Sequence, residues 1–192
     1  MSHRGAAIWI VGLPGCGKSS IAQGIVRFLA KQEYDVVLLA MDDRRKEYFP
    51  KPEYTAQERD EAYALFIGEA VDLVSKGVFV VMDASAYKVE MRTLARRSIL
   101  LFAEIFIHCE LEIAIKRESL RAEGKIMAGL YEKALERKRT GRHFAGLGDV
   151  IGVDVEFEKN PDAEFILDNS YLTEEEALGK VLHFLDMWLK RA

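Results

Sequence analysis

Short apolar runs alternate with helical patterns along most of this 192-residue chain. Five of the runs are rich in branched and aromatic side chains and are bounded by polar residues or glycine, which predicts buried strands. These predicted strands cover residues 6–12, 35–41, 78–83, 103–109 and 165–168.

Helical spacing of apolar residues fills the segments between the predicted strands. Residues 18–31 place their large apolar side chains on one helical face. Residues 55–77 begin with a threonine cap and end at a glycine, so they predict a well-delimited helix. Further helices are predicted near residues 89–101, from about residue 111, and over 173–191, where acids come first and bases last.

The regular alternation of strand and helix predicts an α/β fold. Strands joined by helices run parallel, and helices then cover both faces of the sheet. The length suits a single domain over residues 1–192, and no internal repeat or linker divides it. Ligands of such sheets bind beyond the carboxyl ends of the strands, so the residues that follow each strand are the candidates for function.

The stretch GLPGCGKSS follows the first predicted strand and opens the next helix. It matches G-x-x-x-x-G-K-[ST], the phosphate-binding P-loop, in which backbone N–H groups and the helix N-terminus surround phosphate oxygens. Lys18 is expected to reach the β- and γ-phosphates of ATP, and the Ser19 hydroxyl to coordinate Mg²⁺. The alternative is a glycine-rich turn with a solvated lysine. The predicted nucleotide-binding residues are Gly12, Leu13, Pro14, Gly15, Cys16, Gly17, Lys18, Ser19 and Ser20.

Carboxylates follow the second and third predicted strands. Asp42 and Asp43 come after the second strand, where a carboxylate can accept a proton from an attacking hydroxyl, and Arg44 and Arg45 follow at once. Asp83 ends the third strand, a usual place for an acid associated with Mg²⁺. The alternative in both cases is structural, with the aspartates capping the helices that follow.

Charge is unevenly distributed along the chain. The net charge of −4 argues against general nucleic-acid binding and against an anionic membrane surface. Residues 112–143 nevertheless carry nine Lys and Arg against five Glu. We interpret about 117–146 as a basic lid over a small anionic ligand. The alternative is an exposed helix stabilised by ion pairs between neighbouring turns.

The remaining composition is typical of a cytoplasmic protein. Two cysteines, Cys16 and Cys109, fall in different elements and suggest neither a disulfide framework nor a zinc site. The first residues run into a strand without a signal-peptide pattern, and no apolar run has the length of a membrane span.

With these motifs placed, the chain resembles the adenylylsulfate (APS) kinase family over most of its length. The similar segments are TAQERDEAYALFIGEAVDLVSKG, ELEIAIKRE followed by GLYEKA, HFAG, and EFEKNPDAEFILDN. The resemblance implies an ATP- and Mg²⁺-dependent kinase of sulfate assimilation that phosphorylates the 3′-hydroxyl of adenylylsulfate, and it implies a homodimer.

The resemblance also implies roles for single residues. Asp42 takes the position of the base, Ser85 matches a serine that is phosphorylated in one proposal for the family, and Arg117 matches a nucleotide-contacting arginine. The implied acceptor-binding residues are Asp42, Tyr54, Arg59, Lys88 and Phe144, with Tyr54 and Phe144 on either side of a base. Apart from the resemblance, Arg45 after the second strand is predicted to bind the acceptor anion. Ser19 of the P-loop and Asp83 at the end of the third strand are the predicted metal-binding residues.

Three departures from the family pattern leave more than one candidate for the molecule that accepts the phosphate. The usual Asp-Gly-Asp-Asn becomes Ala-Met-Asp-Asp at residues 40–43, the FISP segment becomes DASAY, and Ala62 replaces an asparagine expected to touch the acceptor. MDDRR and VVMDAS also resemble kinases of other small molecules and of polynucleotide 5′-hydroxyls. Three functions therefore compete: an adenylylsulfate kinase, a kinase of another hydroxyl acceptor, and a regulatory protein that binds ATP without transferring phosphate.

Overall fold

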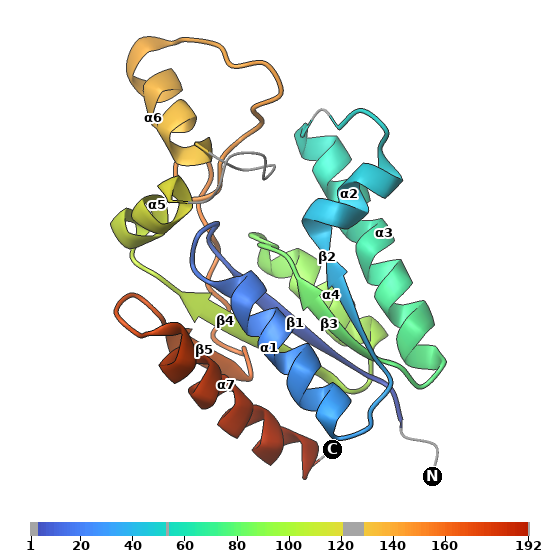
Figure 1. Cartoon of the computed structure of the whole chain (residues 1–192). Helices are drawn as coiled ribbons and strands as arrows, with labels where there is room; N and C mark the ends of the chain where they lie inside the picture. Colours follow the sequence, from blue (N-terminus) through green and yellow to red (C-terminus); the bar gives the residue numbers. More distant parts are fainter. Residues whose placement is uncertain (1–3, 53, 121–128, 192) are drawn as a thin grey trace.

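The computed structural model describes residues 4–52, 54–120 and 129–191. Its five strands form one parallel sheet in the order β2-β3-β1-β4-β5, shown in Figure 1. The predicted parallel α/β fold is confirmed. The strands are β1 (Ala6–Gly12), β2 (Val36–Ala40), β3 (Phe79–Asp83), β4 (Phe102–His108) and β5 (Phe165–Asp168).

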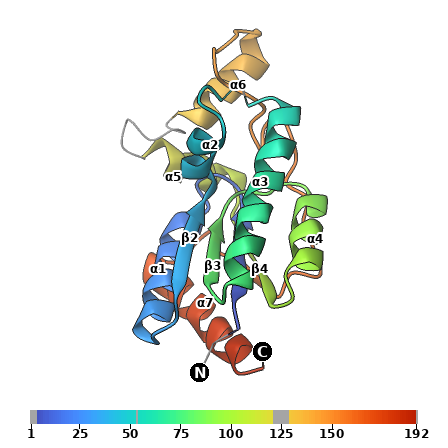
Figure 2. The ribbon, with the colours of Figure 1, turned by 90° about the vertical axis from the view of Figure 1, so that its right-hand side faces the viewer.

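Helices cover both faces of the sheet because the central strand is apolar on both sides. Trp9 of β1 packs with α3 and α4 in one core, whereas Ile8 and Ile10 pack with α1 and α7 in the other. Figure 2 shows α1 and α3 on opposite sides of the strands. The helices are α1 (Lys18–Lys31), α2 (Met41–Tyr48), α3 (Ala56–Ser75), α4 (Val89–Ser98), α5 (Leu111–Ser119), α6 (Leu130–Thr140) and α7 (Glu174–Leu189).

Helix ends follow the capping signals of the sequence. The Thr55 side chain accepts a hydrogen bond from the Glu58 N–H at the start of α3, and Gly77 beyond its end has φ 88°. Thr173 and Glu176 form a complete capping box at the start of α7. Some predicted ends differ from the structure: α4 ends at Ser98, three residues before the predicted end at 101. β2 ends at Ala40, so that Met41 is already the first residue of α2.

The described part of the basic segment contains the last residues of α5 and the whole of α6. Helix α6 lies above the sheet in Figure 1. Leu130, Tyr131 and Ala134 of α6 form a separate small core with Val150. The Tyr131 hydroxyl donates to the Pro14 carbonyl at 3.0 Å, which joins α6 to the P-loop. Residues 121–128 of the predicted lid lie outside the described residues.

Candidate active site

The P-loop is wound so tightly that its glycines have no room for a side chain. Gly12, Gly15 and Gly17 have φ of 144°, 82° and 99°. A Cβ atom on Gly12 would lie 2.3 Å from the Ile107 carbonyl oxygen, and one on Gly15 would lie 2.3 Å from that of Ala114. Positive φ and the close backbone approach therefore both require glycine.

Lys18 lies within this loop instead of extending into solvent. Its side chain is buried, and its ammonium donates to the Leu13 carbonyl at 2.9 Å. The alternative of a glycine-rich turn with a solvated lysine is therefore wrong. Asn169, which follows β5, donates from Nδ2 to the Cys16 carbonyl at 2.9 Å and holds the loop from the other side. Sequence reasoning missed Asn169, because its partner lies 153 residues earlier.

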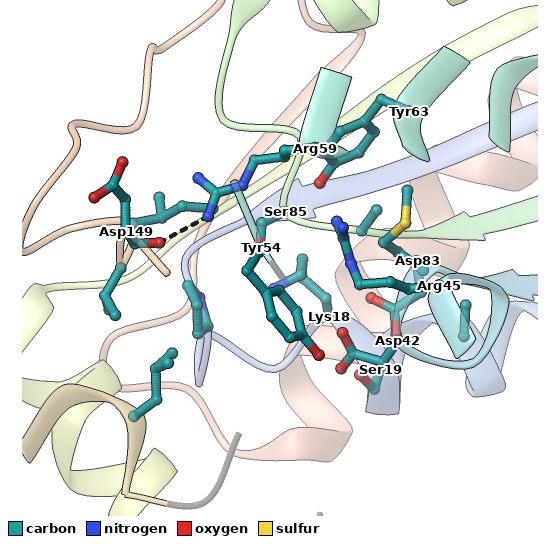
Figure 3. A pocket seen from close by; sticks show the side chains of 17 residues that line it. Lys18, Ser19, Asp42, Arg45, Tyr54, Arg59, Tyr63, Asp83, Ser85 and Asp149 are labelled. Atoms are coloured by element: carbon teal, nitrogen blue, oxygen red, sulfur yellow. Dashed lines mark hydrogen bonds between the residues drawn. The ribbon is translucent and has the colours of Figure 1, made fainter. Parts of the chain in front are cut away.

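A cavity of about 110 Å³ lies at the carboxyl ends of β1, β2 and β3. Figure 3 shows that the labelled side chains surround it from several elements. The expected site residues that line it are Lys18, Ser19, Asp42, Arg45, Tyr54, Arg59, Asp83 and Ser85, together with Pro14 of the P-loop. Tyr63 and Asp149 also line it, although no sequence motif indicates either residue.

Asp42 and Asp43 are separated by the geometry of α2. Both lie in its first turn, and neither makes a side-chain cap hydrogen bond, since Ala40 is the N-cap residue. Only Asp42 lines the cavity. Asp83 is not a helix cap either, because Lys88 is the N-cap residue of α4. The capping alternative is therefore wrong for these aspartates.

Arg45 is held by a buried ion pair. Its Nη1 lies 2.9 Å from Oε1 of Glu58, and both side chains are at most 10% exposed. The same Glu58 oxygen accepts from the Tyr54 N–H at 3.2 Å, and the Arg45 guanidinium lies 5.1 Å from the centre of the Tyr54 ring. Burial raises the pKa of the Tyr54 phenol, so the ring faces the cavity as a neutral group.

Arg59 of α3 lines the cavity, and its guanidinium can bind an anionic ligand there. It is buried, and Nη2 donates to the Asp149 carbonyl at 2.8 Å, the dashed contact in Figure 3. The Arg59 guanidinium also lies 5.3 Å from the centre of the Tyr87 ring. Among the ion pairs of the described residues, none involves Arg59. A carbonyl partner leaves a guanidinium able to bind an anion.

Lys88 does not line the cavity that Arg45 and Arg59 line. Its ammonium lies 3.0 Å from the Asp60 carboxylate in a separate surface groove between α3 and α4. That hydrogen bond raises the pKa of Lys88. Ala62, which stands where the family pattern has an asparagine, is fully buried in the core and does not line the cavity. Of the acceptor-binding residues that the family pattern implies, Lys88 therefore lies outside the cavity.

Phe144 and Arg117 line two further cavities beside the first. Phe144 lines one of about 280 Å³ that shares Tyr54 and Arg59 with the first cavity and adds Lys133. Arg117 lines another of about 320 Å³ beside Gly17 and Ser20 of the P-loop helix. Its Nη1 and Nη2 donate to the carbonyls of Asn169 and Ser170 at 2.8 and 3.2 Å. The cavity lined by Arg117 therefore adjoins the P-loop, whereas the cavity lined by Phe144 adjoins Tyr54 and Arg59.

The oxygen donors of the first cavity suit Mg²⁺. The Ser19 hydroxyl and the Asp83 and Asp42 carboxylates line the same wall. Mg²⁺ is typically held by one or two protein oxygens, with phosphates and waters completing its coordination. Within the described ranges, no group of three or more His, Cys, Asp or Glu residues could hold a metal alone. Helices that are long and apolar enough to cross a membrane are also missing from the described part of the chain.

Comparisons with known proteins agree with this geometry. The family model for adenylylsulphate kinase matches residues 4–168. The adenylyl-sulfate kinase of Gloeothece citriformis is 31% identical over 189 residues, 97% of each chain. The cytidine diphosphoramidate kinase of Campylobacter jejuni is 28% identical over 170 residues, which are 88% of this chain and 89% of that protein.

A solved structure shows the same fold. The APS kinase of Mycobacterium tuberculosis, solved with AMPPNP and APS, superposes with a TM-score of 0.78 at 23% identity, covering 96% of this chain and 99% of that one. The family match over most of the chain, the parallel sheet with its P-loop and the cavity beside that loop lead to one assignment. The chain belongs to the adenylylsulfate kinase family of phosphotransferases.

Proposed function

We propose that the protein transfers the γ-phosphate of ATP to the 3′-hydroxyl of adenylylsulfate, giving 3′-phosphoadenylylsulfate and ADP. The observation that carries the proposal is the single cavity in which Lys18 of the P-loop faces Asp42 and Arg59. A phosphate donor site and an anion-binding acceptor site thereby share one volume. The match to the family over residues 4–168 supports adenylylsulfate as the acceptor.

The donor side is formed by the P-loop and its neighbours. Residues 12–20 surround the phosphates of ATP, and Lys18 exchanges its bond to the Leu13 carbonyl for the β- and γ-phosphates. Arg117, fixed on two carbonyls beside the P-loop, forms the edge of the adenine site. Ser19 and Asp83 would hold Mg²⁺, which when bound neutralises charge on the phosphates.

The acceptor side supplies the nucleophile. Asp42 accepts the proton of the acceptor's 3′-hydroxyl while the oxygen of that hydroxyl bonds to the γ-phosphorus. The bond from the γ-phosphorus to the β–γ bridging oxygen breaks in the same step, and ADP leaves. Arg45 and Arg59 bind the phosphosulfate, and Ser85 adds a hydroxyl to the same wall. Tyr54 and Phe144, which line adjoining cavities, contact the acceptor base.

The described part of the basic segment would exclude water from this site. Leu130 of α6 lines both the first cavity and the Phe144 cavity, and Tyr131 joins α6 to the P-loop. Excluding water prevents hydrolysis of the bound ATP. We include in the proposal a single catalytic domain with its lid at about 117–146, acting as a cytoplasmic homodimer. Size-exclusion chromatography with light scattering tests the homodimer.

A second candidate acceptor is another nucleotide. Ala62 lies in the core where the family pattern has a polar acceptor contact, and the Campylobacter jejuni relative is named for cytidine diphosphoramidate. Labelled ATP, supplied with adenylylsulfate, cytidine nucleotides, sugars and a 5′-hydroxyl oligonucleotide, separates these candidates. Transfer to adenylylsulfate supports the proposal, and transfer only to a cytidine nucleotide favours the second candidate. Transfer only to a sugar or to the oligonucleotide contradicts both candidates, and no transfer favours a regulatory protein.

Arg59 and Lys88 provide a matched pair for testing the acceptor site. Arg59→Ala should raise KM for adenylylsulfate roughly 10- to 100-fold, because a charge-assisted contact to the acceptor is lost. Lys88→Ala should change it by less than about threefold, because Lys88 makes an exposed ion pair with Asp60 outside the cavity. Steady-state kinetics with adenylylsulfate as the varied substrate measures both. Equal effects of the two substitutions would contradict this assignment.

A further inference from the structure

The backbone of Ala86 is held from two sides in an uncommon conformation. Its φ is 45°, a left-handed value that residues other than glycine rarely adopt, and the residue is fully buried. The Tyr63 hydroxyl accepts a hydrogen bond from the Ala86 N–H at 2.7 Å. Arg92 Nη1 donates to the Ala86 carbonyl at 2.6 Å. Both backbone polar groups of this residue therefore have side-chain partners from two different helices.

Arg92 is itself fixed by a buried network. Its Nε lies 3.1 Å from Oε1 of Glu104, and neither side chain is more than 1% exposed. The guanidinium also donates to the Glu158 carbonyl and lies 4.9 Å from the centre of the Phe157 ring. Asn160 donates to the other Glu104 oxygen at 2.6 Å. Because separating a buried ion pair is costly, this network holds the guanidinium in one place.

Ala86 directly follows a residue that lines the catalytic cavity. Ser85 immediately precedes Ala86 and lines the cavity with Lys18, Asp42 and Arg59. Figure 3 shows Tyr63 and Ser85 approaching this region from different elements. A left-handed residue next to a site persists only where its surroundings determine it strongly. The arrangement therefore fixes the direction in which Ser85 enters the cavity.

We propose that Tyr63 and Arg92 are positioning residues for the acceptor site: they hold Ala86 in its left-handed conformation and so keep Ser85 against the bound acceptor. The inference rests on the proposed function for the identity of the acceptor. Burial raises the pKa of Tyr63 to about 12, so the phenol remains neutral at physiological pH. Neither residue contacts the transferred phosphate in this scheme; both act through Ala86.

Two substitutions and one control test the proposal. Tyr63→Phe retains the ring that packs against Trp9 and removes only the hydroxyl. Arg92→Lys retains a positive charge opposite Glu104 and removes the branched donors. Phe66→Leu alters the same core on α3, at a side chain that packs against the Trp9 and Tyr63 rings but makes no hydrogen bond to Ala86. Thermal midpoints identify the loss of stability in each variant.

The kinetic expectation differs from that of a merely structural role. Tyr63→Phe and Arg92→Lys should each raise KM for adenylylsulfate about tenfold and leave KM for ATP within about twofold, because a buried N–H or carbonyl loses its partner beside the acceptor only. Phe66→Leu should lower the thermal midpoint and change neither KM. The proposal is overturned if KM for adenylylsulfate stays unchanged in both test variants, or rises equally in the control.

Hydrogen exchange tests the same contacts without any acceptor. Backbone amides of residues 84–88 in the unliganded protein should exchange about tenfold faster in Tyr63→Phe and Arg92→Lys than in Phe66→Leu. Unchanged exchange would refute the role of the two side chains. If the wild type transfers no phosphate to adenylylsulfate, the proposed function fails, and the exchange result still decides whether Tyr63 and Arg92 hold this segment.

Discussion

Replacing Lys18 by alanine is expected to lower kcat for phosphate transfer roughly 10²- to 10³-fold, the loss usual for one preorganised donor to developing charge. Lys18 is buried within the P-loop, and its ammonium donates a hydrogen bond to the Leu13 carbonyl. The ammonium therefore already lies beside the proposed phosphate site. Nucleotide binding, measured by calorimetry with a non-hydrolysable ATP analogue, should weaken far less than the rate falls.

Lys31 provides the control for Lys18. It ends the same helix α1 and is exposed, so Lys31→Ala changes the charge of the chain equally without touching the loop. Its rate should stay within about twofold of the wild type, because an exposed surface charge far from the site contributes little. Wild-type turnover in Lys18→Ala would show that the P-loop assignment of this lysine is wrong.

Asp42→Asn should lower kcat roughly 10²- to 10⁴-fold, the usual contribution of a positioned general base. The substitution retains the shape of the side chain and removes its ability to accept the proton of the 3′-hydroxyl. KM for ATP and for adenylylsulfate should change by only a few-fold, because the amide still occupies the same wall of the cavity. Initial rates with each substrate varied in turn measure the three constants.

The neighbouring Asp43 makes this test specific. Asp43 lies in the same first turn of α2 and is exposed, but it does not line the cavity. Asp43→Asn should therefore retain kcat within about threefold, since surface substitutions usually have small effects. Full turnover in Asp42→Asn would exclude Asp42 as the base, and an equal loss in both variants would point to the helix N-terminus instead.

Much of the fold could be predicted because local signals and global architecture agree. The predicted bounds of β1, α1 and β5 are those of the structure, since each element has a clear apolar pattern and a nearby glycine or polar stop. The predicted end of β2 lies one residue too late, at Met41, which is the first residue of α2. An apolar residue at this position fits the pattern of a buried strand as well as that of a buried helical turn. Fold class followed from the alternation of elements alone.

Charged side chains were much harder to predict than apolar ones. The apolar pattern of residues 103–109 predicts a buried strand and gives no sign that Glu104 within β4 is the buried partner of Arg92. Lys88 was expected at the acceptor but binds Asp60, and Arg45 depends on Glu58, which no sequence motif indicated. Such pairs depend on which helices and strands lie side by side in the fold, and the spacing of residues along the sequence does not show that.

Local sequence patterns are sufficient to predict the parallel sheet, the phosphate-binding loop and the residues that follow the strands. Those features depend on local spacing, since an apolar period and a glycine-rich turn are properties of adjacent residues. Tertiary packing places Asp42 and not Asp43 at the cavity and leaves Lys88 outside it. The same packing brings Tyr63 and Arg92 into hydrogen bonds with the Ala86 backbone. These outcomes depend on the packing of distant helices, because direction and burial of a side chain are set by neighbours far along the chain.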